Sequence, residues 1–202
     1  MNIYLTRHAQ KDNSQKYNLK DHFNRTLTQV GLKQAKELAN YLSQYQINKI
    51  FSSNMPRALM TAEEVGSKIG ISAVVKSPSL READPCVIPN HPDRDKIKIQ
   101  CWQEWGFKPK HGESYNEGEE RFSNFFWDEI VESCSDQENI LIVSHGRVMR
   151  LFLFKFLVDG KKVIKEPYSH VAITHLKIDK QNKELKILRY NDNSFLPEDL
   201  RI

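Results

Sequence analysis

Residues 1–10 read MNIYLTRHAQ, and the rest of the chain is interpreted from this stretch. Within residues 2–6 isoleucine and leucine lie on one face and Tyr4 lies on the other, which is typical of a strand covered by helices on both faces of a parallel sheet. Arg7 and His8 follow at the end of this strand. Because ligands of open α/β sheets bind beyond the carboxyl ends of the strands, we expect this cation and this imidazole to contact a ligand.

Three other segments repeat the arrangement of a short apolar strand followed by chemically active side chains. They are residues 49–53, which precede Arg57, residues 140–143, which precede His145, and residues 73–75, which a loop joins to Glu82. If these strands are neighbours in one parallel sheet, Arg57 and His145 converge with the Arg7-His8 pair at one edge. Two guanidiniums and two imidazoles would bind a dianion there, and the Glu82 carboxyl could transfer a proton. The pattern outlines a site for phosphate transfer.

The composition indicates one globular domain over residues 1–202. The chain has 202 residues, of which 39% are hydrophobic and 28% are charged, so it is long enough to bury a sizeable core. The net charge of +4 suits a small anionic substrate. Lysine and arginine are scattered rather than clustered, so we predict no nucleic-acid surface. Cys86, Cys101 and Cys134 form no CxxC pair, which predicts neither a zinc site nor a disulfide framework and favours a reducing, cytoplasmic compartment.

We predict neither a signal peptide nor a membrane span. Arg7 precedes any long apolar run, which argues against a signal peptide. The most apolar segment, residues 148–158, is interrupted by Arg150 and Lys155 and is too short to cross a bilayer, so we predict a buried helix there.

The remaining pattern alternates helices with these strands and ends in a hairpin. Helices are expected from an N-cap at Thr28 to about residue 45, from Pro56 to Gly70, and from the capping box at 114–117 to about residue 133. Residues 171–178 and 185–190, with a turn between them, predict an antiparallel edge, and the polar tail from residue 191 is expected to be loosely held. The fold class is therefore α/β, a three-layer α/β/α sandwich with a mostly parallel sheet and an antiparallel edge.

Residues 77–113 interrupt this alternation. They contain five prolines together with Trp102, Trp105 and Phe107. Because long irregular stretches in compact domains are usually functional, we predict a lid-like insertion over the sheet edge with a short helix near residues 93–102. An aromatic patch that simply covers the core explains the two tryptophans equally well.

Six motifs, in order along nearly the whole chain, resemble the histidine phosphatase superfamily, which includes the cofactor-dependent phosphoglycerate mutases. They are the "RHG"-like signature at residues 6–10, the helix motif at 27–35, the "SS..RA..TA" motif at 52–62, the "L.E" element at 80–82, "GES" at 112–114 and "SHG" at 143–146. One such motif is weak, whereas six in register are highly specific. The resemblance implies a phosphoglycerate mutase-like sandwich.

The resemblance also implies a role for each motif residue. His8 would be the nucleophile that forms a phosphohistidine, while Arg7, Arg57 and His145 would hold the phosphoryl group. Glu82 would donate a proton to the leaving oxygen and later help to activate water. We count His8, Glu82 and His145 as catalytic. Neither a metal nor a cofactor is implied.

Among the positions that depart from the family pattern, two concern candidate ligands or rim residues of the expected site. Ser14 stands where many members have an asparagine that touches phosphate, and the adjacent Asn13 is a candidate to replace it, so both are predicted phosphate ligands. Arg147 stands where a small residue is common. It follows His145-Gly146 at a predicted helix start, where anions bind, and is a candidate for the rim of the pocket. The commoner role of such an arginine is to pair with an acid or to point into solvent.

Three functions stay open at this point. The first is a phosphomonoester hydrolase, the second a mutase of the same superfamily, and the third a non-catalytic relative that binds phosphorylated ligands or a partner protein. A zinc site formed by His8, His145 and Glu82 would be opposed by the two arginines and fits no common zinc spacing. We predict the hydrolase, acting on a small phosphorylated substrate, because the predicted lid is modest and proline-broken and water should reach the phosphohistidine. The sequence identifies neither the substrate nor the oligomeric state.

Overall fold

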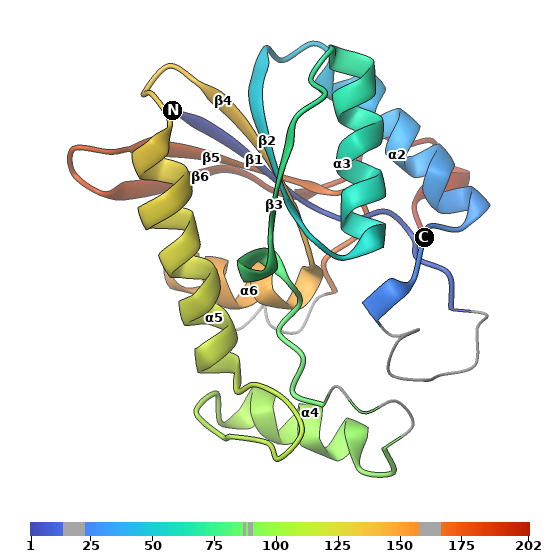
Figure 1. Cartoon of the computed structure of the whole chain (residues 1–202), viewed down its shortest axis with the longest axis vertical. Helices are drawn as coiled ribbons and strands as arrows, with labels where there is room; N and C mark the ends of the chain where they lie inside the picture. Colours follow the sequence, from blue (N-terminus) through green and yellow to red (C-terminus); the bar gives the residue numbers. More distant parts are fainter. Residues whose placement is uncertain (14–22, 87, 89–90, 158–166) are drawn as a thin grey trace.

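The computed structural model describes residues 1–13, 23–86, 88, 91–157 and 167–202, which form a six-stranded sheet (Figure 1). Its strands, in the order β3-β2-β4-β1-β5-β6, are β3 (Val74–Ser77), β2 (Ile47–Ser53), β4 (Asn139–Ser144), β1 (Asn2–Arg7), β5 (Ile173–Asp179) and β6 (Glu184–Asp192). The first four are parallel, whereas β5 runs antiparallel to β1 and β6 antiparallel to β5. The predicted mostly parallel sheet with an antiparallel edge is confirmed.

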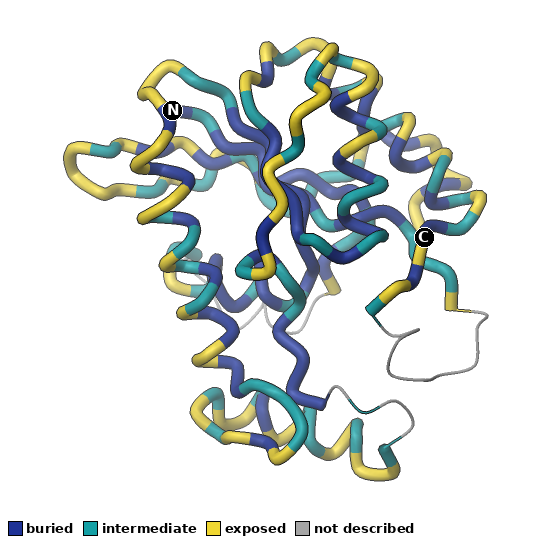
Figure 2. Tube along the Cα trace, viewed as in Figure 1, coloured by how far each residue is buried: buried dark blue, intermediate teal, exposed yellow. Residues whose placement is uncertain are grey.

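Strand β1 lies in the middle of the sheet, between β4 and β5, and is buried on both faces. Ile3 and Leu5 belong to one hydrophobic cluster and Tyr4 to the other. Neighbouring β4 alternates in the same way, with Ile142 in the first cluster and Leu141 in the second. Figure 2 shows the central strands as mostly buried, whereas yellow, exposed positions recur along the helices, on the loops and on the edge strand β3.

Helices cover both faces of the sheet and complete the predicted three-layer sandwich. One face carries α2 (Gln29–Leu42) and α3 (Pro56–Ile69). The other face carries α6 (Gly146–Leu153) and α5 (Tyr115–Asn124), which continues as a π-helical turn over Phe125–Val131. No helix within these described ranges combines the length and the apolar character that crossing a bilayer requires.

The helix ends follow the local signals in the sequence. The Thr28 hydroxyl accepts a hydrogen bond from the Gly31 amide at 2.9 Å and caps α2. Gly70 ends α3 in the left-handed conformation, at a φ of 81°. At Ser114 and Glu117 both halves of the predicted capping box are formed. Helix α2 ends at residue 42 rather than near 45, because the chain turns there to enter β2.

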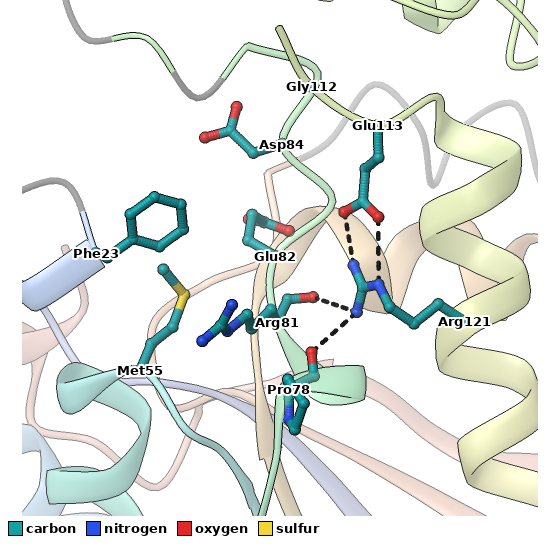
Figure 3. A pocket seen from close by; sticks show the side chains of 9 residues that line it. All are labelled: Phe23, Met55, Pro78, Arg81, Glu82, Asp84, Gly112, Glu113 and Arg121. Atoms are coloured by element: carbon teal, nitrogen blue, oxygen red, sulfur yellow. Dashed lines mark hydrogen bonds and ion pairs between the residues drawn. The ribbon is translucent and has the colours of Figure 1, made fainter. Parts of the chain in front are cut away.

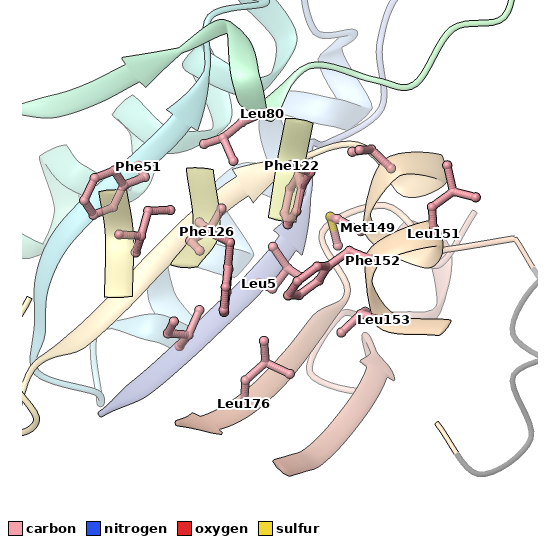
Figure 4. Close-up of a cluster of buried hydrophobic side chains, with 14 of the residues drawn as sticks. Leu5, Phe51, Leu80, Phe122, Phe126, Met149, Leu151, Phe152, Leu153 and Leu176 are labelled. Atoms are coloured by element: carbon pink, nitrogen blue, oxygen red, sulfur yellow. The ribbon is translucent and has the colours of Figure 1, made fainter. Parts of the chain in front are cut away.

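Helix α6 begins directly after β4 and packs its apolar face against the sheet. The Phe152 ring lies 5.0 Å from that of Phe122 and 4.7 Å from that of Phe126, measured between centroids (Figure 4). The buried helix predicted at residues 148–158 is confirmed for residues 148–153, a 3-10 turn follows over Phe154–Phe156, and position 158 lies outside the described residues. This packing holds the β4–α6 junction, where His145 lies, against the core.

Residues 77–113 contain a 3-10 turn at Pro78–Leu80 and helix α4 (Arg94–Gln103). The helix begins and ends one residue later than the predicted range of 93–102. Figure 1 shows α4 apart from the sheet, near the end at which α5 begins. The Trp102 ring lies 4.7 Å from that of Tyr115, and Trp105 also packs against the core cluster. Both tryptophans thus cover the core, as the alternative interpretation had it.

The prediction of a loosely held tail is wrong. Leu196 and Leu200 are 1% and 7% exposed and belong to the cluster beneath α2 and α3. The Gln34 amide of α2 donates a hydrogen bond to the Leu200 carbonyl at 2.8 Å. Two leucines buried in a polar segment are enough to hold it, because apolar burial rather than average composition determines docking.

Candidate active site

The two histidines come together because β1 and β4 are parallel neighbours. Arg7 pairs with Ser144 in register, so Arg7-His8 and His145 emerge at the same edge of the sheet. The His8 amide donates to the Ser144 carbonyl at 3.0 Å. The rings of His8 and His145 meet edge to face, with centroids 5.0 Å apart. The convergence predicted from the strand ends is therefore present in the structure.

Arg57 enters the same site from the first turn of α3. Thr61, one turn further along, accepts a hydrogen bond from the Ala9 amide at 3.1 Å and donates to the Arg57 carbonyl at 2.7 Å. These bonds join α3 to the loop after β1. They place the Arg57 Nε group 3.2 Å from His8 Nε2.

The hydrogen bonds of His8 define which ring nitrogen carries the proton. Nδ1 lies 2.7 Å from the Ala9 carbonyl oxygen, which can only accept, so Nδ1 carries the hydrogen. Nε2 therefore keeps its lone pair and accepts from Arg57. Burial lowers the pKa of His8 well below its ordinary value, and the nearby Arg57 and His145 lower it further. His8 is a neutral imidazole at physiological pH, the form that acts as a nucleophile.

Two buried polar atoms beside His8 make no hydrogen bond within the part of the chain that the structure describes. They are Arg57 Nη1 and His145 Nδ1. The other ring nitrogen of His145 lies 2.9 Å from the Ser53 hydroxyl. Burial and Arg57 together lower the pKa of His145 well below its usual range. An orphaned buried donor costs about 1–3 kcal/mol, and a phosphoryl oxygen is the kind of acceptor that would satisfy Arg57 Nη1, and also His145 Nδ1 in the tautomer that carries its hydrogen there.

Arg7 reaches the site past Gly146. Its Nη1 donates to the Tyr168 carbonyl at 2.5 Å. A Cβ at position 146 would stand 3.3 Å from Arg7 Cδ and 3.2 Å from Tyr168 Cβ, tighter than most real contacts. Glycine at the start of α6 therefore leaves the guanidinium room to lie beside this edge of the sheet.

Glu82 is held at the N-terminus of α6. Ser144 donates its hydroxyl hydrogen to the Leu80 carbonyl at 2.8 Å, which ties this segment to the end of β4. The Glu82 carboxylate accepts from the amides of Arg147 at 3.1 Å and Val148 at 2.9 Å. The acid is thus attached to the helix that follows His145.

A cavity of about 390 Å³ joins these groups and has a strongly cationic lining. Among the described residues, seven basic side chains line it: Arg7, Lys11, Arg25, Arg57, Arg94, Lys98 and Arg147. Within the described ranges the acidic lining consists of Glu82 and Asp84, and the buried His8 also forms part of the wall. His145 is fully buried and reaches the site through its contact with His8. The cavity is built for an anion.

The model of the histidine phosphatase superfamily (branch 1) matches residues 3–193. The chain belongs to this superfamily. A curated relative is phosphoglycerate mutase-like protein 4 of Arabidopsis thaliana, 25% identical over 81% of this chain and 74% of that protein.

Solved structures show that the fold is shared with other proteins. Mycobacterial glucosyl-3-phosphoglycerate phosphatase superposes with a TM-score of 0.76 at 21% identity, covering 95% of this chain and 99% of that one. The alpha-ribazole phosphatase of Shigella flexneri superposes with a TM-score of 0.75 at 22% identity, covering 95% and 96%. At these identities the likeness concerns the fold.

Of the predicted phosphate ligands, Asn13 lines the cavity and its side-chain oxygen accepts a hydrogen bond from Arg25 Nη1 at 2.5 Å. Ser14 lies outside the described residues. Arg147 lines the cavity as predicted, and its Nη1 donates to the Ala83 carbonyl at 2.5 Å. Its guanidinium is therefore bound to the protein rather than pointing into solvent.

The sequence interpretation missed several residues of the cavity. They are Lys11, Arg25, Asp84, Arg94 and Lys98. Lys11 could have been predicted as a residue of the cavity, because it follows His8 by only three positions. Arg94 and Lys98 are four residues apart on α4, a spacing that places both on one helix face. That this face meets the cationic cavity depends on how α4 packs against the rest of the chain.

Lys11 is distinctive among these cations because its ammonium forms no ion pair or hydrogen bond with the described residues. Burial lowers its pKa to about 8, and the positive charges of Arg57, Arg25 and Arg7 add to this while Glu82 opposes it. An ammonium in this position would bind a phosphoryl oxygen at neutral pH and lose its charge in mild base.

We therefore expect kcat/KM for a phosphomonoester to fall as the pH rises through about 8, because the free enzyme loses the Lys11 charge. Lys11→Gln should lower kcat/KM about 10-fold at neutral pH and remove this descending limb, since a charged hydrogen bond is lost. Lys11→Arg, which stays charged, should keep kcat/KM flat into more alkaline solution. A descending limb that survives unchanged in Lys11→Gln would assign the titration to another group.

Proposed function

We propose that this protein is a phosphomonoester hydrolase that works through a phosphohistidine at His8. The observation that carries the proposal is the state of His8: a buried, neutral imidazole whose Nε2 lone pair lies beside Arg57 at the wall of a cationic cavity. An anion-binding cavity alone would suit a binding protein. A nucleophile held with its lone pair at such a cavity favours covalent chemistry.

In the first step the Arg57 Nε–H moves its hydrogen bond from His8 Nε2 to a phosphoryl oxygen, and the freed Nε2 lone pair attacks phosphorus. The N–P bond forms as the bond from phosphorus to the leaving oxygen breaks, and Glu82 gives that oxygen its proton. Arg7 and Arg57 neutralise the charge on the phosphoryl oxygens. Because these groups are held in place by protein hydrogen bonds, little reorganisation is needed as charge develops.

In the second step a water molecule attacks the phosphohistidine. The Glu82 carboxylate accepts the proton of that water while the N–P bond breaks, which releases inorganic phosphate and restores neutral His8. The stabilising cations are the same as in the first step. The site therefore runs both halves of the reaction with one set of residues.

We predicted residues 77–113 to be a lid, and the proposal keeps part of that prediction. Helix α4 contributes Arg94 and Lys98 to the lining of the cavity. Arg94 Nη2 donates to both carboxylate oxygens of Asp84, at 3.0 and 3.1 Å. We propose that this insertion helps to enclose the anion. The cytoplasmic location and the lack of nucleic-acid or membrane partners stay predictions.

The experiment that tests the function follows the phosphoenzyme itself. His8 is phosphorylated with a good donor such as a nitrophenyl phosphate, and loss of the acid-labile label is measured with and without 3-phosphoglycerate. We expect hydrolysis at the turnover rate without an acceptor, because water reaches the phosphohistidine.

Two outcomes of this experiment would contradict the proposal. A stable phosphoenzyme that discharges onto phosphoglycerate and yields a bisphosphate would identify a mutase. No labelling by any donor, with phosphate still bound, would identify a non-catalytic binder. His8→Ala serves as the unlabelled control.

A further inference from the structure

A second pocket, drawn in Figure 3, shares two lining residues, Glu82 and Asp84, with the cationic cavity, which is the phosphate cavity of the proposed function. Its volume is about 290 Å³. In the proposed reaction Glu82 protonates the leaving oxygen, so the group attached to that oxygen must lie beside the Glu82 carboxyl. The second pocket is therefore the place for the leaving alcohol of the substrate.

The pocket has an apolar wall. Phe23, Met55 and Pro78 contribute it, and Figure 3 shows Phe23 and Met55 together on one side of Glu82. Aromatic rings pack favourably on phenylalanine and on the methionine thioether, which distinguishes this wall from a purely aliphatic one. A ring carried by the alcohol would thus find suitable partners here.

The charged side chains of this pocket already have protein partners. Arg121 donates to both carboxylate oxygens of Glu113, at 2.6 and 3.2 Å, and to the Ser79 carbonyl at 2.6 Å. Arg81 Nε donates to the Asn54 side chain at 2.7 Å. These groups do not require a charged ligand for compensation.

The balance of acidic and basic side chains also differs between the two pockets. Three carboxyl groups, those of Glu82, Asp84 and Glu113, face two arginines in the second pocket. In the phosphate cavity, by contrast, the lysines and arginines of the lining outnumber its two carboxyl groups. An acidic alcohol such as glycerate would bring its carboxylate to a lining in which Arg121 is paired with Glu113 and Arg81 is bound to Asn54, so it would lose hydration without gaining an uncompensated cation.

We propose that the second pocket binds the alcohol part of the substrate and that this alcohol is uncharged and carries an aromatic or heteroaromatic ring. The inference rests on the proposed function for its placement of the leaving oxygen. It names the substrate class: phosphomonoesters of ring-bearing neutral alcohols.

The test compares two esters whose alcohols have similar basicity, 2-phenylethyl phosphate and ethyl phosphate. Matching the leaving groups removes any difference in chemical reactivity. We expect kcat/KM to be about 10- to 100-fold higher for the phenylethyl ester, because its ring is buried against the apolar wall. 3-Phosphoglycerate should be poorer than either. Equal values for the two matched esters would overturn the assignment.

Two variants test whether the preference for the phenylethyl ester arises in the second pocket. Phe23→Ala should bring the ratio of the two kcat/KM values close to one, because the ring loses its aromatic partner. Phe195→Ala is the matched control: Phe195 stacks on Tyr41 with centroids 4.5 Å apart and lines neither pocket. Its ratio should equal that of the wild type. A ratio that survives in Phe23→Ala would show that the ring binds elsewhere.

A binding measurement separates this inference from the proposed hydrolysis. Calorimetry with the His8→Ala protein compares the affinities for the two matched esters without turnover. Tighter binding of the phenylethyl ester supports the pocket even if no ester is hydrolysed, in which case the proposed function alone has failed. Equal affinities, or no binding of either ester, would overturn the pocket assignment.

Discussion

Replacing His8 by alanine is expected to lower turnover of the best phosphomonoester by at least about 1,000-fold, because the reaction loses its covalent nucleophile. The effect should appear in kcat as well as in kcat/KM, since the N–P bond cannot form. Initial rates of phosphate release measure the loss. The acid-labile label on the protein should disappear in parallel.

The matched control for this variant is His170→Ala. The His170 ring lies 6.0 Å from that of His8, and its Nδ1 is 3.2 Å from the Ile202 carbonyl. Burial lowers the pKa of His170 to about 4, so it too is neutral. We expect this variant to stay within about tenfold of the wild type, because His170 takes no part in forming the covalent bond. A His8→Ala protein that is folded, by its thermal unfolding midpoint, yet keeps more than about a tenth of the activity would place the nucleophile elsewhere.

The second large effect is expected for Glu82→Gln, and it should depend on the leaving group. General acid catalysis contributes about 100- to 10,000-fold when the departing oxygen is basic. An alkyl phosphate should therefore lose about that factor, whereas a nitrophenyl phosphate, whose leaving group needs little protonation, should lose less than about tenfold. Initial rates on both esters give the comparison. Glutamine keeps one carbonyl oxygen that can accept the amide hydrogen bonds at the start of α6, so the local structure should persist.

Asp84→Asn and Glu113→Gln are the companion variants, because both carboxyl groups lie in the pocket that adjoins Glu82. Asp84 is engaged with Arg94 and Glu113 with Arg121, so neither should discriminate between alkyl and nitrophenyl esters. Equal losses of activity on the two esters in Glu82→Gln would show that Glu82 is not the general acid. A leaving-group dependence in Asp84→Asn or Glu113→Gln would assign the acid role to the carboxyl replaced in that variant.

Much of the fold was predictable because its signals are local. The alternation in residues 2–6 and 140–143 predicts strands buried on both faces, and the cap at Thr28, Pro56 and the capping box at Ser114 predict where three helices begin. Parallel strands then bring their carboxyl ends to one edge. For this reason the meeting of Arg7-His8 with Arg57 and His145 followed from the sequence, as did the family.

Other features depend on contacts between segments that are distant in the chain, and only the tertiary structure decided them. The Glu82 carboxylate accepts from amides about 65 positions further on, as the separation to Arg147 shows. The cations that α4 contributes to the cavity, the pocket lined by Phe23 and Met55, and the docking of Leu200 on α2 all arise from such packing.

The protonation states belong to this second group. His8 and Lys11 have ordinary pKa values as isolated side chains. Burial among arginines makes the first a neutral nucleophile and lowers the pKa of the second to about 8. Desolvation and charge proximity are properties of the folded arrangement, so the sequence determined which groups meet at the sheet edge, and the tertiary structure decided their charge.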